Sequence, residues 1–200
     1  TSWLVASRTH RRTGRLCREC CTERDLLNIG GTFYELPAEN AGGFAKARAV
    51  ATHRSQVYDY CTWRGLFVIS GVDPSAEAGE HFVKSDDGKA ALWVGVADDL
   101  WKIGKPVGFG GPWLETNVKA GVPSDPYIMT GFDKKSVFMA ADSEVEITLE
   151  LDITGDGTWI PFRSFKVLGF CRHDLGDIRA YWVRAVADRD CKAFVQFWYE

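Results

Sequence analysis

Helical periodicity is almost absent from this chain, and short apolar stretches broken by turn residues take its place. The 200 residues include 20 glycines and 7 prolines, and Gly, Pro, Asn and Asp separate most of these stretches. One helical turn is expected, with Thr22 as its N-cap and Gly30 and Gly31 at its end. The sequence otherwise predicts an all-β fold. Its expected strands are residues 3–7, 16–21, 32–36, 44–53, 57–63, 66–71, 91–97, 127–130, 136–140, 145–152, 159–167, 179–187 and 192–199.

After about residue 120 the strand pattern is regular. Val145, Ile147, Leu149 and Leu151 are apolar and the residues between them are polar, so one face of this strand is expected to be buried and the other solvated. Residues 155–157, Gly-Asp-Gly, supply a hairpin turn into the next strand. Several short strands at even spacing predict that residues 121–200 form an antiparallel β-sandwich of immunoglobulin-like type.

Before residue 120 the strands are flanked by glycine-rich loops that carry aromatic and charged residues. Residues 60–65, Tyr-Cys-Thr-Trp-Arg-Gly, turn into the apolar stretch 66–71, and residues 91–97 are suited to be the next antiparallel strand. Repeated four-stranded meanders with aromatic turns are typical of propeller blades. We therefore interpret residues 1–120 as a partial β-propeller-like region.

Composition and charge exclude several classes of function. Apolar residues make up 46% of the chain, as in a packed core, and no apolar run approaches the length of a membrane span. Residues 1–56 hold nine Lys or Arg against five Asp or Glu, whereas residues 57–200 hold fifteen against twenty-two. The arginines of the first segment fall on both sides of an expected hairpin and have no recognition motif beside them. We therefore expect no nucleic-acid partner.

Neither a metal nor a cofactor is expected. Residues 17–21, Cys-Arg-Glu-Cys-Cys, contain a C-x-x-C core, but no second pair stands at finger-like spacing. Free thiols are the default interpretation, and a disulfide between Cys171 and Cys191 is the alternative for that pair. Residues 152–157 resemble the start of a calcium loop, but Arg163 occupies the position of the bidentate glutamate, which favours a hairpin turn.

Polar and aromatic groups suited to a ligand site are concentrated in residues 91–113. An apolar strand runs into Asp98 and Asp99, cations follow at Lys102 and Lys105, and a Gly/Pro loop ends in Trp113. Adjacent strand residues face opposite sides, so the two aspartates share a site only if the strand ends before them. The alternative is a turn in which an aspartate accepts backbone hydrogen bonds and Lys102 neutralises it.

Sugar chemistry would use these groups in two ways. Glycoside hydrolysis needs two carboxylates, one of them an acid with a raised pKa, and a histidine can serve as base or donor, although a lone strand histidine is more often structural. The candidate catalytic residues are Glu35, Glu39, His53, Asp98 and Asp99. Indole rings stack on the apolar faces of sugars, and a guanidinium suits the carboxylate of a uronic acid. The candidate ligand-binding residues are Arg48, Trp63, Trp101, Lys105, Trp113 and Tyr127.

Several motifs carry a resemblance to a known group of proteins. They are residues 31–44, GTFYELPAENAGGF; 98–102, DDLWK; 110–113, GGPW; 124–127, SDPY; and 180–184, AYWVR. With them the chain, over roughly residues 1–200, resembles the carboxy-terminal part of large, mostly uncharacterised β-propeller-type proteins of polysaccharide-degrading bacteria. The resemblance implies final propeller blades followed by a β-sandwich, in a protein that is extracellular or periplasmic. It supplies no catalytic residues.

The chain starts at Thr1, without an initiator Met, and enters a strand-like run at once. We therefore expect it to be a piece of a longer protein, whose remaining chain is a partner. The leading functional hypothesis is glycan binding or processing within a larger carbohydrate-active protein, with glycosidic-bond cleavage as the reaction if the chain is catalytic. The alternative is a non-catalytic structural or interaction β-module.

Overall fold

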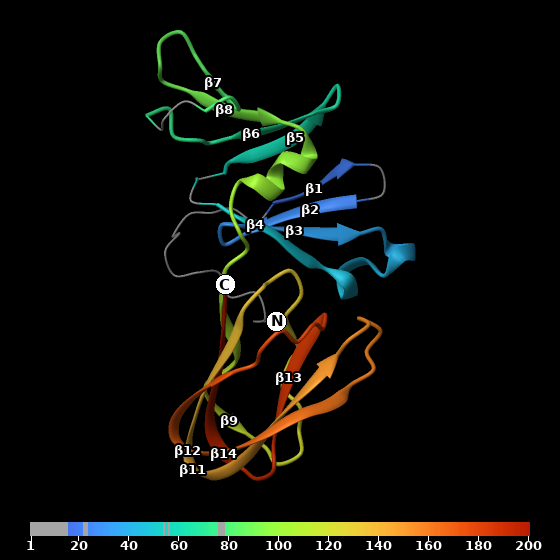
Figure 1. Ribbon diagram of the computed structural model, residues 1–200, viewed down its shortest axis with the longest axis vertical. Coiled ribbons are helices and arrows are strands. Elements are labelled where there is room, and N and C mark those ends of the chain that lie inside the picture. Colours follow the sequence, from blue (N-terminus) through green and yellow to red (C-terminus); the bar gives the residue numbers. More distant parts are fainter. Residues whose placement is uncertain (1–15, 22–23, 54, 56, 76–78) are drawn as a thin grey trace. The chain divides into compact units, whose positions relative to one another are not determined.

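The computed structural model describes residues 16–21, 24–53, 55, 57–75 and 79–200, and Figure 1 shows their arrangement into strands. Strands account for 57% and helices for 7%, which confirms the predicted all-β class. The chain divides into two compact units. We call residues 16–43 and 49–106 the N-terminal unit and residues 44–48 and 107–200 the C-terminal unit. The expected strand at residues 3–7 lies outside the described residues.

The first sheet of the N-terminal unit has the order β1-β2-β3-β4. These strands are β1 (Leu16–Cys21), β2 (Arg24–Ile29), β3 (Thr32–Pro37) and β4 (Arg48–Thr52). The turn between β2 and β3 has two left-handed positions, Gly30 with φ of 61° and Gly31 with φ of 85°, which glycine adopts without a steric cost. Two short 3-10 helices, η1 (Glu39–Ala41) and η2 (Gly43–Lys46), follow β3 along the chain.

The helical turn expected after Thr22 is wrong, because residues 24–29 form β2. This strand pairs antiparallel with β1 on one edge and with β3 on the other. Leu26 and Ile29 of β2 are buried. Pairing on both edges gives the backbone N–H and C=O groups of this segment hydrogen-bond partners. These inter-strand hydrogen bonds stabilise a strand more than the N-cap residue stabilises a helix.

The second sheet of the N-terminal unit has the order β5-β6-β8-β7. Its strands are β5 (Asp59–Trp63), β6 (Leu66–Ser70), β7 (Phe82–Lys84) and β8 (Ala91–Gly95). The hairpin from β5 to β6 turns at Arg64 and Gly65, whose φ angles of 49° and 82° are those of a two-residue turn that matches strand twist. A 3-10 helix, η3 (Ala97–Lys102), follows β8, so the strand expected at 91–97 ends earlier than predicted.

One core is shared by the two sheets of the N-terminal unit. The ring of Phe33 in β3 meets the ring of Tyr60 in β5 edge-on, with centroids 5.4 Å apart. Phe67 of β6 packs against both rings. The hydroxyl of Tyr60 lies 2.8 Å from the carbonyl oxygen of Leu16 and also within hydrogen-bonding distance of that of Leu26. Aromatic packing and a buried phenol therefore join the two sheets.

A single six-stranded, nearly closed, barrel-like sheet forms the C-terminal unit. Its order is β10-β13-β11-β14-β9, and β12 pairs with β11. The strands are β9 (Gly108–Val118), β10 (Tyr127–Ile128), β11 (Lys135–Asp152), β12 (Ile160–Asp174), β13 (Trp182–Ala187) and β14 (Cys191–Tyr199). Because β9 pairs with β14, the C-terminal unit resumes at Val107, before the boundary expected near residue 120.

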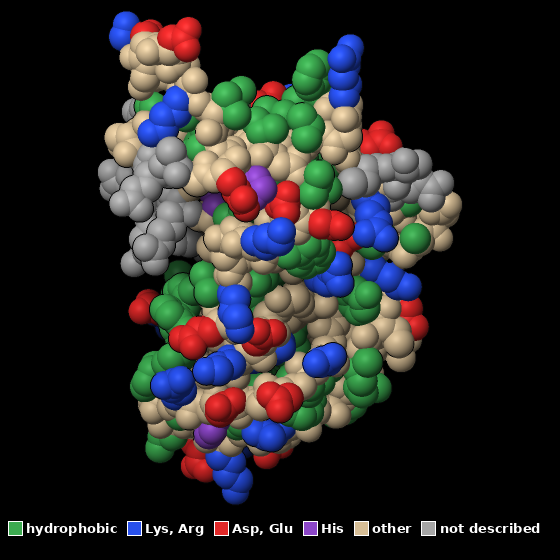
Figure 2. All heavy atoms as spheres, turned by 45° about the horizontal axis from the view of Figure 1, so that its top comes forward, with side chains coloured by type: hydrophobic (Ala, Val, Ile, Leu, Met, Phe, Trp, Pro, Cys, Tyr) green, Lys and Arg blue, Asp and Glu red, His purple; other side chains and the backbone are tan. Residues whose placement is uncertain are grey.

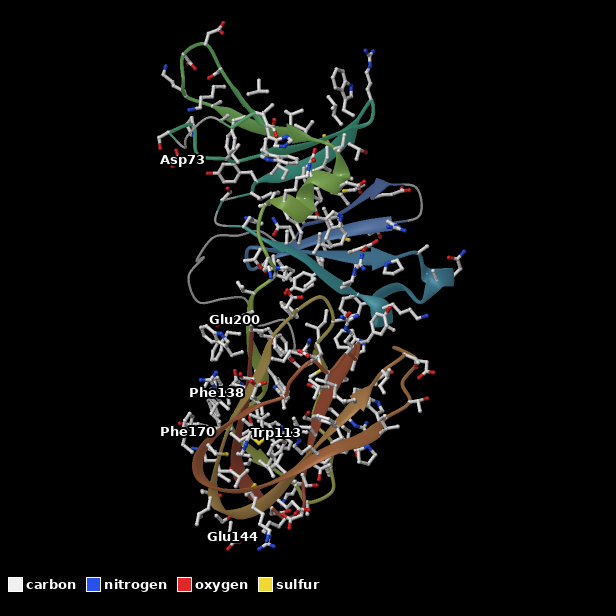
Figure 3. All side chains as sticks on the ribbon, viewed as in Figure 1. Asp73, Trp113, Phe138, Glu144, Phe170 and Glu200 are labelled. Carbon is white, nitrogen blue, oxygen red and sulfur yellow. The ribbon has the colours of Figure 1, made fainter. Side chains whose placement is uncertain are left out.

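Strand β11 is the central strand of this sheet and pairs with three other strands. One of its edges pairs with β12, whereas the other pairs with β14 over residues 135–141 and with β13 over residues 147–152. A bulge between Ala141 and Val145 separates the two halves, and Glu144 within it is labelled in Figure 3. The strands expected at 136–140 and 145–152 are therefore two halves of one bulged strand, because the bulge changes partners without ending the pairing.

The expected alternation builds the core of the C-terminal unit. Val145, Ile147, Leu149 and Leu151 are at most 2% exposed, which confirms the predicted buried face of this strand. The turn after β11 is closed by Asp152, which is itself buried. Its carboxylate accepts hydrogen bonds from the N–H groups of Gly155 at 2.7 Å and Gly157 at 2.9 Å. This geometry, followed by the β11–β12 pairing, confirms the predicted hairpin.

Candidate functional site

The acidic pair predicted from residues 91–113 lies on η3, after β8 has ended. Asp98 is exposed, whereas Asp99 is partly buried. The carboxylate of Asp99 accepts a hydrogen bond from the N–H of Val96 at 2.9 Å and one from Nζ of Lys102 at 2.8 Å. These hydrogen bonds hold the pKa of Asp99 below its usual value. Asp99 therefore accepts a backbone hydrogen bond within a turn and is neutralised by Lys102, as the turn alternative predicts.

Close packing surrounds Asp99. A Cβ added to Gly95 would lie 3.0 Å from the Asp99 carboxylate and 2.5 Å from the indole of Trp93, so only glycine fits there. The imidazole of His81 stacks on the same indole, with ring centroids 4.9 Å apart. The charge of His81 also contributes to the lowered pKa of Asp99. The sequence did not single out His81, because it lies in a short segment before β7 with no motif around it.

Glu35 and Glu39 occupy different elements of the N-terminal unit. Glu35 lies in β3 and forms an ion pair with Arg24, whose Nη1 is 2.8 Å from its carboxylate. Glu39 is exposed in η1. Arg48, the candidate for a uronic-acid carboxylate, is exposed at the start of β4. The structure gives Glu35 a cross-strand partner from β2, as expected for a charge on a sheet surface.

His53 is buried beside β4, with 5% of its surface exposed. Its Nδ1 lies 2.9 Å from the carbonyl oxygen of Ser55, and its Nε2 lies 3.2 Å from Oδ1 of the buried Asn28. The ring packs at 5.0 Å from the ring of Phe33 in the core. These contacts are those of a structural histidine, the role that such a residue more often has.

The predicted aromatic residues separate into two groups. Trp63 and Trp101 of the N-terminal unit are 59% and 48% exposed, and the guanidinium of Arg64 covers the Trp63 ring at 5.0 Å. Trp113 and Tyr127 of the C-terminal unit are 5% and 6% exposed. At these exposures neither ring presents a face to solvent, and the role of the two residues as ligand contacts stays a prediction.

From Gly108 onward, the segment expected as a Gly/Pro loop before Trp113 is strand β9, whereas residues 104–107 ahead of it are a loop. Trp113, labelled in Figure 3, pairs with Val195 of β14 and is buried. Gly111 allows this close pairing, because a Cβ there would lie 2.2 Å from the carbonyl oxygen of Val195. Lys105, the other predicted ligand contact in this segment, is exposed ahead of the strand.

An aromatic surface that the sequence analysis missed lies on the outer face of the C-terminal unit. Register places Phe170 and Phe194 on either side of Ala140, and Trp198 opposite Ser136. Along β11, Ser136, Phe138 and Ala140 alternate with the buried Val137 and Met139. They and the residues paired with them therefore face outward. We call this surface the aromatic face. Its members are Phe109, Phe138, Phe170, Phe194 and Trp198.

Four rings of the aromatic face form two contacting pairs. Phe138 and Phe170 have centroids 6.0 Å apart, and Figure 3 labels both on the outer side of the sheet. Phe109 and Trp198 have centroids 5.6 Å apart. Phe170, Trp198 and Phe109 are 69%, 45% and 44% exposed. Exposed large apolar groups gathered on one face make it a candidate binding surface.

A trough divides this surface where the small Ala140 stands between two phenylalanines. A cleft of about 390 Å³ opens there, lined by Ala140, Phe170 and Phe194 together with polar residues at its rim. Lys192 at the rim lies 3.1 Å from the carboxylate of Glu115, and its backbone N–H donates to Asp142 at 3.0 Å. The trough therefore combines ring faces with charged groups of both signs.

Arginine adds a polar group directly to the ring surface. The guanidinium of Arg172 lies over the ring of Phe138 at 5.5 Å and donates to the hydroxyl of Ser136 at 3.3 Å. Trp198 donates its indole N–H to Glu200 at 3.0 Å. Each of these donors lies beside a ring, which is the combination that an amphipathic ligand requires.

Several charges of the described residues form ion pairs. Arg18 pairs with Asp59 at 2.8 Å and Arg184 with Glu150 at 2.6 Å. On the face drawn in Figure 2, Lys and Arg side chains are interspersed with Asp and Glu side chains.

Three further findings concern metals, thiols and membranes. Among the described residues, no group of three or more His, Cys, Asp or Glu side chains is arranged to hold a metal ion. Cys171 and Cys191 are separate free thiols, so the alternative of a disulfide between them is wrong. In the described part of the chain, no helix combines the length and hydropathy that crossing a bilayer requires.

Comparison with known proteins yields no relative. No family model matches the chain, and neither a curated protein nor a solved structure shows significant similarity to it.

Proposed function

We propose that this chain binds glycans and that the aromatic face of the C-terminal unit contacts the sugar rings. The observation that carries the proposal is the set of five rings on the outer face of β9, β14, β11 and β12. Phenylalanine and tryptophan rings offer flat apolar surfaces to the C–H faces of sugars. Arg172, Glu115 and Lys192 beside the rings are placed to exchange hydrogen bonds with hydroxyl groups.

Recognition is preferred over cleavage as the proposed activity. Cleavage needs a carboxylic acid whose pKa is raised, so that it is protonated when the bond breaks. The pKa of Asp99 is instead lowered by Lys102 and by the backbone of Val96. The acids named for cleavage lie in the N-terminal unit, whereas the aromatic face belongs to the C-terminal unit.

We also propose a finer description of the two units. The order β1-β2-β3-β4 supports a propeller blade, which is a four-stranded meander. The second sheet departs from that pattern, because β7 lies beyond β8 at its edge. The pairing of β11 with β14 and then with β13 supports an immunoglobulin-like sandwich, in which two packed layers share strands at a bend.

The larger setting is part of the same proposal. We infer that the chain works within a carbohydrate-active protein that is extracellular or periplasmic, where the rest of that protein is its partner. The resemblance carried by residues 31–44 and 180–184 supports this setting. The exposed rings add support, because a glycan-binding surface suits a protein that acts on polysaccharide.

A binding screen followed by calorimetry tests the proposal. A glycan array first identifies a ligand, and its dissociation constant is then measured for the wild-type chain and for Phe138→Ala and Phe170→Ala. Loss of one stacked ring is expected to weaken binding by about fivefold, which corresponds to about 1 kcal/mol. The matched control is Trp101→Ala, which removes a half-exposed ring from the N-terminal unit.

Two outcomes would contradict the proposed site. Unchanged affinity in Phe138→Ala and Phe170→Ala, with intact circular dichroism, would remove the aromatic face as the contact surface. Loss of affinity only in Trp101→Ala would move the site to η3. Absence of any glycan ligand would favour the non-catalytic interaction module.

A further inference from the structure

A second concavity in the C-terminal unit lies where β10 ends and β11 begins. Its volume is about 650 Å³, and its walls come from residues 129–133, the first residue of β11 and residues 177, 179 and 180. Buried Met129, Phe132 and Ala180 supply apolar wall, and Lys135 lies among them. The size suits a small organic molecule.

Lys135 is the unusual residue of this cleft. Only 4% of its surface is exposed, although lysine is almost never buried to this degree without a charged partner. Nζ of Lys135 donates to the carbonyl oxygen of Phe132 at 2.6 Å, and this is its one hydrogen bond within the described residues. The partner is a neutral carbonyl, and no carboxylate of the described residues forms an ion pair with the ammonium.

A second poorly satisfied polar group lies beside the lysine. Tyr199 of β14 is directly opposite Lys135 of β11, so the two side chains leave the same face of the sheet. The Tyr199 hydroxyl is buried and has no hydrogen-bond partner among the described residues. The Tyr199 ring packs on Phe132, with centroids 4.7 Å apart, which keeps this end of the unit apolar.

Charged groups around the cleft act on Lys135 in opposite directions. Burial lowers the pKa of Lys135, and the nearby Arg179 lowers it further, whereas Asp133 and Asp177 raise it. The negative charges of Asp133 and Asp177 match the positive charges of Arg179 and a protonated Lys135 in number. The cleft therefore has no net charge that would select an anion. An amine that is desolvated and placed beside another cation is activated as a nucleophile.

We propose that Lys135 is a nucleophilic amine that condenses with a small aldehyde admitted by this cleft. The Nζ lone pair attacks the carbonyl carbon and the C–N bond forms. The two protons of the neutral amine pass to the carbonyl oxygen, the C–O bond breaks, and water leaves. The product is an imine, and no oxidant or reductant is consumed. A neutral amine still donates to Phe132 while its lone pair attacks, so the observed hydrogen bond is compatible with the reaction.

Reductive trapping with propanal and cyanoborohydride at pH 7 tests the proposal on the whole chain. The reagent converts an imine into a stable secondary amine, and peptide mapping locates it among the 10 lysines. We expect Lys135 to react severalfold faster than its exposed neighbour Lys134, because burial lowers the pKa of Lys135 and leaves more of its amine unprotonated at pH 7. In denaturant the two lysines should react at the same rate.

Matched variants separate a reactive lysine from a structural one. Lys134→Met should leave the fast trapping unchanged, and Lys135→Met should abolish it. Arg179→Gln should slow trapping at pH 7, because removing the guanidinium raises the pKa of Lys135. Asp177→Asn should accelerate it for the opposite reason. Trapping at Lys135 that is absent, or no faster than at Lys134 in the folded chain, would overturn the proposal.

Discussion

The rings of Phe138 on β11 and Phe170 on β12 lie 6.0 Å apart on the solvent side of the C-terminal sheet. The two residues are not directly opposite, because Phe138 pairs with Arg172 and Phe170 pairs with Ala140. Their rings therefore meet diagonally across the two strands, and the small Ala140 leaves the space between Phe170 and Phe194 open. This diagonal contact is the centre of the proposed glycan surface.

Filling the trough should block the surface without disturbing the core. Ala140→Leu places a larger side chain between Phe170 and Phe194 on the outer face, away from the buried Val137 and Met139. We expect glycan affinity to fall by about tenfold or more while the free energy of unfolding changes by about 0.5 kcal/mol or less. Calorimetric titration and urea melts measure the two quantities. Unchanged affinity would show that the ligand does not enter the trough.

Gly111 should be intolerant of any side chain. An added Cβ would lie 2.2 Å from the Val195 carbonyl oxygen and 2.7 Å from Cα of Gln196, both backbone atoms. We expect Gly111→Ala to lower the free energy of unfolding by about 1–3 kcal/mol, because β9 must move away from β14. The control is Gly79→Ala, where the nearest atom is a Phe82 side-chain carbon at 3.7 Å. Equal stability of the two variants in urea melts would contradict the close pairing.

The Asp152 carboxylate should contribute strongly to the β11–β12 turn. Asp152→Asn replaces one acceptor oxygen with an N–H donor, which would then face a backbone N–H of Gly155 or Gly157. The expected loss in the free energy of unfolding is about 1–3 kcal/mol, the usual result of leaving a buried donor unpaired. Asp156→Asn, at an exposed position of the same turn, is the control. A neutral effect of Asp152→Asn would show that the turn forms without this acceptor.

Acid should destabilise the N-terminal unit through Asp99. The folded-state pKa of Asp99 is lowered below 3.8 by Lys102 and the backbone of Val96. The stabilisation is therefore fully present above the unfolded pKa and is lost as pH falls through the folded pKa. Asp99→Asn should flatten the pH dependence of stability below about pH 4, the usual range of an aspartate. Thermal melts from neutral pH to acid measure this, and parallel curves for variant and wild type would contradict it.

Parts of the site could be predicted from the sequence, and parts could not. The turn alternative for Asp99 required only the local pattern of an aspartate with a lysine three residues later, and the hydrogen bonds to Val96 and Lys102 agree with it. Trp113 was misplaced because its flanking glycines and prolines indicate a loop, whereas β14 supplies a partner strand that no local pattern shows. The aromatic face was missed because its rings come from β9, β11, β12 and β14, which are far apart in the chain.

The sequence by itself determined that this chain folds into strands, because alternation with a period of two makes one face of each segment apolar and only a sheet buries such a face. It also placed β1 and the buried residues of β11, where the pattern is local and unbroken. Tertiary structure decided that residues 24–29 are a strand and that β11 changes partners at its bulge. These features depend on backbone hydrogen bonds between segments that are distant in the sequence. The local sequence of a segment does not identify the strand with which it pairs.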